Sequence, residues 1–185
     1  MAQRGTLMHA RFFSSTAAKL AIAVIVLGSY IVQPARAADL ESLAARVQVL
    51  EDREEIRALI LAYGQAHDHR DYRAFASLFA TNGEWIGGLG SATGPESIFQ
   101  LMDKSIGHNP VPAGSGTYHV MTNDQIRIDG DRASSTTKWI YITAGDDNSP
   151  KVTYLGHYDD QFVRENGHWR FLRRQSISDI SPLKR

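Results

Sequence analysis

The sequence contains no cysteine, which excludes a disulfide framework, a thiolate zinc site and a cysteine nucleophile. It also lacks an excess of either charge, because 20 basic residues balance 20 acidic ones. A nucleic-acid-binding protein usually carries a basic excess, so we expect no nucleic-acid partner. The 185 residues are 43% hydrophobic, which is ordinary for a globular protein. The length indicates one domain with room for an appended segment.

The first 37 residues have the pattern of a secretory signal peptide. Three basic residues precede Leu20–Val32, an apolar run of 13 residues, and Ala35-Arg36-Ala37 supplies an A-x-A cleavage site. The run is shorter than the roughly 20 residues that span a bilayer, which disfavours an uncleaved anchor. We therefore expect residues 1–37 to be removed and residues 38–185 to form one periplasmic or secreted domain without membrane attachment.

Apolar spacing predicts helices between residues 40 and 106. The stripe Leu40–Leu50 repeats at intervals of three and four and packs either on its own domain or on a neighbouring subunit. Asp52, with Glu55 three residues later, fits a capping box, so a second helix is expected to start there. A third helix is expected over Tyr72–Ala80, ended by Thr81-Asn82-Gly83, and a fourth begins at Pro95.

The last 70 residues have the pattern of an antiparallel meander. Asp129-Gly130-Asp131 and Glu165-Asn166-Gly167 are hairpin signals between β-rich runs. We expect strands at residues 117–128, 133–143, 152–164 and 168–178, after a short strand that begins at Glu84. Helices followed by a meander predict an α+β domain in which the helices cover one face of a curved sheet. The pattern does not decide which face of the 152–164 strand points inward.

Three segments together resemble the SnoaL-like branch of the NTF2-like superfamily. They contain Ala66-His67-Asp68-His69-Arg70, His119-Val120-Met121-Thr122-Asn123 and Gly156-His157-Tyr158-Asp159-Asp160, and the resemblance covers nearly all of residues 40–178. It implies a cone-shaped α+β barrel, in which a strongly curved antiparallel sheet wraps around N-terminal helices and an internal pocket. Members include scytalone dehydratase, hexachlorocyclohexane dehydrochlorinase, ketosteroid isomerase and polyketide cyclases, so the fold alone does not determine a reaction.

The resemblance also points to a catalytic pair. In dehydratase-like and dehydrochlorinase-like members, an aspartate late in the first long helix pairs with a histidine on a strand, and Asp68 and His119 match those positions. A carboxylate that accepts a hydrogen bond from one ring nitrogen makes the other nitrogen a better base. The alternatives are that Asp68 only ends its helix and that His119 is a structural histidine on a strand.

Six further residues are candidates for substrate binding. Tyr63 and His67 lie on one apolar helical stripe, and Asn123 follows His119 by four residues, which places both on one face of a regular strand. For the aromatic candidates, packing in the core is the alternative role. The complete set is Tyr63, His67, Trp85, Asn123, Trp139 and Tyr141.

No metal or cofactor is expected. The pair His67-x-His69 resembles a ligand pair, but positions i and i+2 of a helix diverge by about 200°. The sequence contains no His-Glu-x-x-His motif, no Gly-x-Ser-x-Gly elbow and no nucleotide-binding loop.

Two functions of different classes fit these residues. The first is a cofactor-free lyase or isomerase that abstracts a proton from a small, mostly apolar substrate, for example a cyclic one, in a dehydration, dehydrohalogenation or double-bond migration. The second is a non-catalytic periplasmic module that binds a small hydrophobic ligand or serves in assembly. The resemblance further implies a homodimer or homotrimer, formed through the open face of the sheet.

Overall fold

The structure, a computed structural model, describes residues 16–107 and 116–181, with side chains from residue 36 onward. The chain divides into two compact units, residues 1–47 and residues 48–185. Helix α1 (Thr16–Asp68) begins in the first unit and ends in the second. Within the described residues, no helix combines the length and the apolar character that crossing a membrane requires. Of the expected signal peptide, residues 1–15 lie outside the described residues, and its cleavage stays a prediction.

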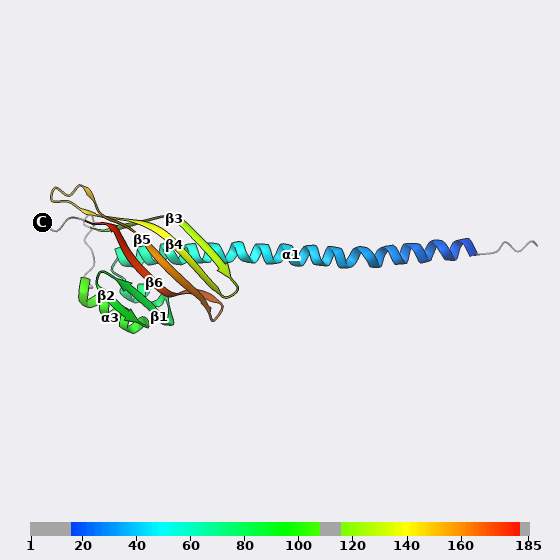
Figure 1. The fold of residues 1–185 in the computed structure, drawn as a ribbon, viewed down its shortest axis with the longest axis horizontal. Coiled ribbons are helices and arrows are strands. Elements are labelled where there is room, and N and C mark those ends of the chain that lie inside the picture. The colour runs from blue at the N-terminus through cyan, green and yellow to red at the C-terminus, as the bar shows by residue number, and fades with distance from the viewer. Residues whose placement is uncertain (1–15, 108–115, 182–185) are drawn as a thin grey trace, which may run out of the picture. The chain divides into compact units, whose positions relative to one another are not determined.

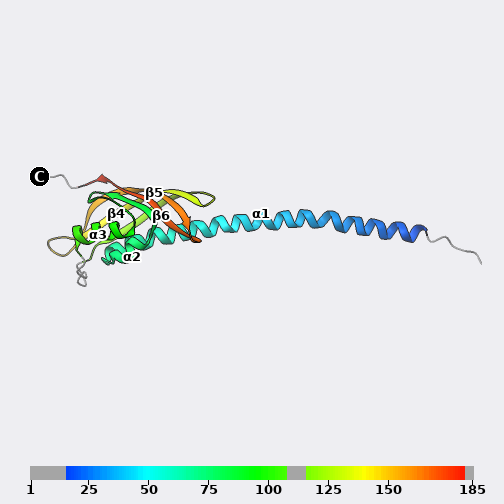
Figure 2. The ribbon, with the colours of Figure 1, turned by 90° about the horizontal axis from the view of Figure 1, so that it is seen from below.

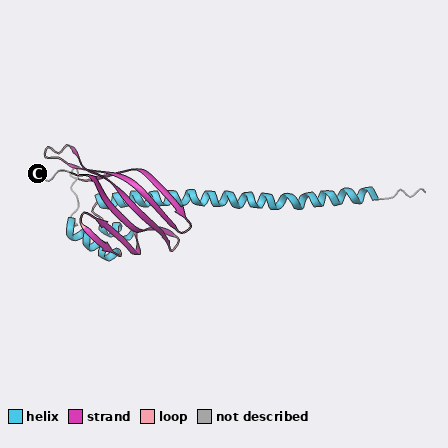
Figure 3. Cartoon of the chain, viewed as in Figure 1, coloured by secondary structure: helices cyan, strands magenta, loops and turns pink. Residues whose placement is uncertain are grey.

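The second unit packs helices on a six-stranded mixed sheet (Figures 1 and 3). The strand order is β2-β1-β6-β5-β4-β3, and all neighbours are antiparallel except β1 and β6, which are parallel. This curved, open sheet confirms the expected α+β class (Figure 2). The elements after α1 are α2 (Tyr72–Ser77), β1 (Phe79–Gly87), β2 (Gly90–Thr93), α3 (Pro95–Ile106), β3 (Tyr118–Asp129), β4 (Arg132–Ala144), β5 (Pro150–Glu165) and β6 (His168–Ile180).

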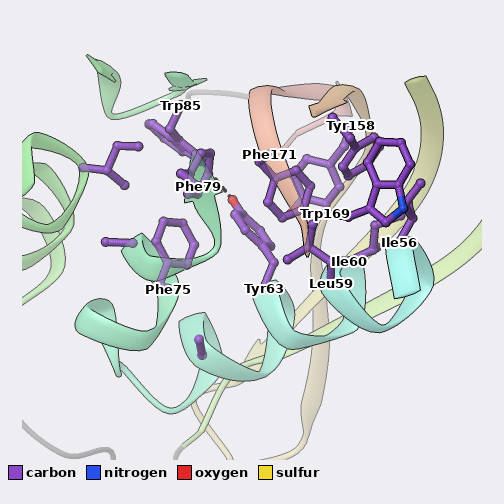
Figure 4. Close-up of a cluster of buried hydrophobic side chains, with 14 of the residues drawn as sticks. Ile56, Leu59, Ile60, Tyr63, Phe75, Phe79, Trp85, Tyr158, Trp169 and Phe171 are labelled. Carbon is purple, nitrogen blue, oxygen red and sulfur yellow. Dashed lines mark hydrogen bonds between the residues drawn. The ribbon is translucent and has the colours of Figure 1, made fainter. Parts of the chain in front are cut away.

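The core lies between the C-terminal part of α1 and the inner face of the sheet. Residues at helical spacing on α1 meet aromatic rings from β5 and β6, as Figure 4 shows. Burying a large apolar side chain contributes about 1.5–3 kcal/mol, so this cluster holds α1 on the sheet. Its central members are Ile56, Leu59, Ile60, Tyr63, Tyr158, Phe162, Trp169 and Phe171.

Helix α1 runs through the position where a new helix was expected to start. Asp52 does not cap a helix: its carboxylate accepts a hydrogen bond from Gln48 and pairs with Arg164 of β5 at 2.6 Å. Glu55 accepts a hydrogen bond from the backbone N–H of Trp169 at 2.9 Å. Inside a continuous helix the backbone N–H groups already have partners, so these two carboxylates attach α1 to the sheet instead.

The third helix is shorter than expected. Asp71 caps α2 by accepting a hydrogen bond from the N–H of Ala74, but the helix ends at Ser77 and Phe79 already belongs to β1. The Phe79 ring is buried against Phe171, its partner in the parallel β1–β6 pairing. This long-range contact overrides the local helical pattern, and the segment expected to stop the helix, Thr81-Asn82-Gly83, continues the strand.

The later predictions agree closely with the structure. Helix α3 starts at Pro95, and the four strands of the meander begin and end within about two residues of the expected positions. Strand β5 turns Tyr158, Asp160 and Phe162 toward the core, which answers the open question of its inner face.

Strands β5 and β6 hold a buried ion pair within this core. Arg174 donates hydrogen bonds to both carboxylate oxygens of Asp160, at 2.8 and 2.7 Å, and both side chains are fully buried. The guanidinium carbon also lies 4.1 Å from the ring centres of Tyr63, Tyr158 and Phe171. Burial lowers the pKa of Arg174, but the adjacent carboxylate outweighs this effect and raises it above its usual value.

Candidate functional site

The candidate catalytic pair lies where α1 ends beside the start of β3. Asp68 is the last residue of α1, and Arg70, in a left-handed conformation (φ 56°), turns the chain toward α2. His119 is the second residue of β3. The negative end of the helix dipole disfavours an aspartate at this position, so hydrogen-bond donors must offset the cost.

Asp68 accepts three hydrogen bonds from the beginning of β3. His119 Nδ1 lies 2.7 Å from Oδ1, the His119 backbone N–H donates to Oδ2 at 2.8 Å, and the Thr117 hydroxyl donates to Oδ1 at 3.0 Å. An ionised carboxylate can only accept, so Nδ1 of the His119 ring carries a proton, and in the neutral imidazole the lone pair is on Nε2. Sequence reasoning missed Thr117, which directly precedes β3 and lies two residues before His119.

Both side chains of the pair are largely shielded from solvent, with 8% exposure for His119 and 16% for Asp68. Burial by itself raises the pKa of Asp68, but the hydrogen bonds from His119 and Thr117 outweigh it and leave the pKa below its usual value. Asp68 is therefore charged at neutral pH, which is the state that orients an imidazole base.

A glycine allows the helix to come this close to β3. A Cβ atom at Gly64 would lie 3.0 Å from Cε of Met121 and 3.3 Å from Cβ of His119. A side chain at this position would require Met121 or His119 to shift by a few tenths of an ångström, so Gly64 favours the close approach of the pair.

The pair opens into a pocket of about 540 Å³. Its wall combines one side of α1, the first half of β3 and the hairpin between β4 and β5. Sequence reasoning did not foresee the contribution of this hairpin, because strand alternation does not predict which turn lies beside the helix end. The lining residues are Leu61, Gln65, Asp68, His69, Gly116, Thr117, Tyr118, His119, Met121, Ile142, Thr143, Ala144, Asn148, Ser149 and Pro150.

His67 and Tyr141 contact the His119 ring, with ring centres 4.6 and 4.7 Å away. Nδ1 of His67 is buried and has no hydrogen-bond partner among the described residues. Burial is the main cause that lowers the pKa of His67 to about 4. His67, Asp68 and His119 each place one ligand-type atom within 4.8 Å of the other two.

The low pKa of His67 predicts a pH-dependent stability. Between pH 4 and about 6.5 the unfolded chain binds a proton at His67 and the folded chain does not, so stability falls as the pH drops through this range. From pH 7.5 to 4.5, wild type should lose about 2–3 kcal/mol more unfolding free energy than His67→Phe, which keeps the ring shape. Urea unfolding in the presence of a metal chelator measures this difference. Parallel pH profiles of the two proteins would contradict it.

Three of the other candidate residues lie in the core and not at the pocket. The indole N–H of Trp85 donates to the hydroxyl of Tyr63 at 2.9 Å, and both side chains are buried (Figure 4). Trp139 is also buried, stacks near Tyr158 and covers Gly156. Within the described residues, these rings support the fold around the site rather than line the 540 Å³ pocket.

Asn123 does not share the surroundings of His119. It lies at an irregularity of the β3–β4 pairing between Thr122 and Gln125, has a left-handed backbone (φ 54°) and is exposed. A bulge of this kind breaks the alternation on which the expectation was based. Asn123 is not among the residues that line the pocket.

Comparisons with known proteins agree with this architecture. The family model described as a SnoaL-like domain matches residues 48–175. Uncharacterized proteins of Mycobacterium tuberculosis and Mycobacterium bovis are 32% identical over 135 residues, which cover 69% of this chain and 86% of theirs.

Solved structures show the same fold. An NTF2-like protein with a cystatin-like fold from Novosphingobium aromaticivorans is 29% identical, with a TM-score of 0.67 over 76% of this chain and 90% of its own. A hexachlorocyclohexane dehydrochlorinase is 21% identical, with a TM-score of 0.62 over 75% of this chain and 93% of its own. The family match and the shared fold together show that this protein belongs to the SnoaL-like domain family of the NTF2-like superfamily.

Proposed function

We propose that the protein is a cofactor-independent lyase or isomerase in which His119 is the general base. The observation that carries the proposal is the 2.7 Å contact between His119 Nδ1 and Asp68 Oδ1 at the wall of the 540 Å³ pocket. A base must be oriented, kept unprotonated at one nitrogen and accessible to substrate. The three hydrogen bonds on Asp68 meet the first condition, and the Nδ1–H···Oδ1 bond makes Nε2 the basic nitrogen of the neutral ring. The position of His119 in the pocket wall meets the third.

The chemical step follows from this arrangement. Nε2 of His119 takes a proton from a substrate carbon, and the Asp68 carboxylate stabilises the resulting imidazolium. The electron pair of the broken C–H bond forms a new double bond. In a lyase reaction a hydroxide or halide leaves from the adjacent carbon, and in an isomerase reaction the existing double bond shifts and the proton returns at another carbon.

The pocket favours a small and mostly apolar substrate. Leu61, Met121, Ile142 and Pro150 provide apolar surface, and a few hydroxyl and amide groups lie among them. This composition and volume are typical of small-molecule sites. The similar dehydrochlorinase is named for a halogenated cyclic substrate, which supports elimination from a ring as one reaction to test first.

A substrate screen tests the proposal. Wild type and His119→Ala are incubated with hydroxylated, halogenated and unsaturated cyclic compounds, and products are identified by mass spectrometry. Turnover that disappears in the variant supports the base. Saturable binding of these compounds without turnover in wild type would point instead to a ligand-binding module.

We also infer that the protein is exported and processed after Ala37. The support is the basic start, the short apolar run and the Ala35-Arg36-Ala37 site. N-terminal sequencing of the protein recovered from the periplasm of an expressing bacterium should begin at Ala38. Recovery of material that begins at Met1 would overturn the inference.

We further propose that a second copy of the chain covers one end of the outer sheet face. At this end Val120, Ile140, Leu155 and Ile180 are neighbours across four strands, and Val120 and Ile180 are 42% and 63% exposed. An apolar patch on an otherwise polar surface commonly marks an interface. Light scattering should give a dimer or trimer for wild type, a smaller mass for Val120→Asp and no change for Gln125→Asp at the polar end. A monomeric wild type would contradict this.

A further inference from the structure

Two histidines and an aspartate converge where α1 meets β3. His67 and Asp68 are adjacent on the last turn of α1, His119 faces them from β3, and one ligand-type atom of each lies within 4.8 Å of the other two. The sequence analysis considered only His67 with His69 as metal ligands. The histidine that lies close to His67 in the structure is His119, which comes from a strand about 50 residues later. We propose that His67, Asp68 and His119 bind a divalent transition metal ion of the Zn²⁺ class.

The donor set selects the class of ion. Two imidazoles and one carboxylate suit Zn²⁺, Co²⁺, Ni²⁺ and Fe²⁺, whereas Mg²⁺ and Ca²⁺ prefer sites built only from oxygen. A tetrahedral ion with bonds of about 2.1 Å places its ligands about 3.4 Å apart. Atoms already within 4.8 Å of one another therefore reach coordination distance through small side-chain movements.

The His67 ring is available as a ligand. Its buried Nδ1 has no hydrogen-bond partner in the part of the chain that the structure describes. The ring instead contacts the rings of Tyr72, Phe75, His119 and Tyr141. Buried polar atoms without partners are rare in folded proteins and commonly mark a site for water, an ion or a ligand.

The surroundings provide support and access for an ion. Thr117 and the backbone N–H of His119 already orient the Asp68 carboxylate, as outer hydrogen bonds do for metal ligands. Asp68 and His119 line the 540 Å³ pocket, which gives the ion a path and leaves coordination positions for water. An ion bound to His119 occupies the lone pair that the proposed base needs, so the metal-bound form would not carry out the proposed reaction. Because ion binding is measured without substrate, a failure of this proposal can be distinguished from a failure of the proposed function.

The experiment titrates the purified, chelator-treated protein with ZnCl₂ by calorimetry and with CoCl₂ by visible absorption. Wild type should bind one ion per chain with micromolar or tighter affinity, and Co²⁺ should show the absorption bands of nitrogen–oxygen coordination. His67→Phe, Asp68→Asn and His119→Ala should each weaken binding by about tenfold or more, because each removes or neutralises a ligand.

The matched control is His157→Ala. His157 Nδ1 lies 2.8 Å from Asp179, so it is also a histidine–carboxylate pair, but Lys138 contacts the same aspartate and repels a cation. This variant should bind Zn²⁺ like wild type. Thermal melts show whether each variant is folded, and His67→Gln is a second variant if His67→Phe is unstable. No saturable binding by wild type, or equal affinity of wild type and the folded His67 variants, would overturn the proposal.

Discussion

Replacing His119 by alanine should reduce turnover by ~10²–10⁴-fold without unfolding the protein, because this is the usual contribution of a general base. The variant removes the nitrogen that takes the substrate proton, whereas the core contacts between α1 and the sheet remain. The measurement is the initial rate on whichever substrate the screen identifies, with a thermal melt of the same preparation.

Asp68→Asn should cause a similar loss for a different reason. The amide keeps the shape of the side chain but removes the charge that orients His119 and stabilises the imidazolium. Because the two residues act as a unit, the double variant should be little slower than the slower single variant. Losses that multiply in the double variant would show that the two residues act independently.

His157→Ala is the control for a general effect of losing a histidine–aspartate pair. Its Nδ1 lies 2.8 Å from Asp179 on the outer face of the sheet, nearly the same distance as in the Asp68–His119 pair. It should retain full activity. If the folded His119→Ala and Asp68→Asn proteins keep wild-type rates, the pair has a structural role and no catalytic one.

The second large effect concerns stability. Arg174→Met should lower the free energy of unfolding by about 3–5 kcal/mol, because it leaves the Asp160 carboxylate buried without its partner. The serine hydroxyl of Ser135, 3.2 Å from that carboxylate, cannot replace two charged hydrogen bonds. Urea unfolding at pH 7 measures the loss.

Replacing both members of the buried pair should cost less than replacing one. Arg174→Met combined with Asp160→Val removes the stranded charge as well as the pair, and apolar replacements of buried pairs are often tolerated. Arg127→Met, at an exposed arginine of β3, should stay within about 0.5 kcal/mol of wild type. A double variant at least as unstable as Arg174→Met would show that the pair itself, and not the stranded charge, sets the cost.

The order of the elements and the partnership of Asp68 with His119 could be predicted from the sequence. Turn signals such as Asn166-Gly167 specify local geometry, and the family resemblance supplied the long-range pairing of helix end and strand. The capping box at Asp52 was misleading because the same carboxylate can cap a helix or pair with Arg164, and only the tertiary contact decides between them.

The buried pair was missed for a reason that lies in the strand register. Counting from the β5–β6 turn, regular pairing would place Asp160 opposite Arg173. A shift between Gln161 and Phe162 moves the register by one residue, so Arg174 becomes the neighbour of Asp160 and points inward. A one-residue shift exchanges the two faces of a strand, and nothing in the local sequence marks this one. The bulge at Asn123 likewise breaks the strand alternation, so Asn123 does not lie on the same face as His119 as the sequence predicts.

The position of β6 in the sheet has a consequence for how the chain folds. Although it follows the other described strands in the sequence, β6 lies between β5 and β1 in the sheet (Figure 1). Until residues 168–180 leave the ribosome, the β1–β2 hairpin has no partner in the meander, and the pairing of Phe79 with Phe171 cannot form. The sheet therefore cannot be completed before residues 168–180 are available to pair. This late closure is compatible with the export proposed above, because a chain has to remain unfolded to pass through a secretion channel.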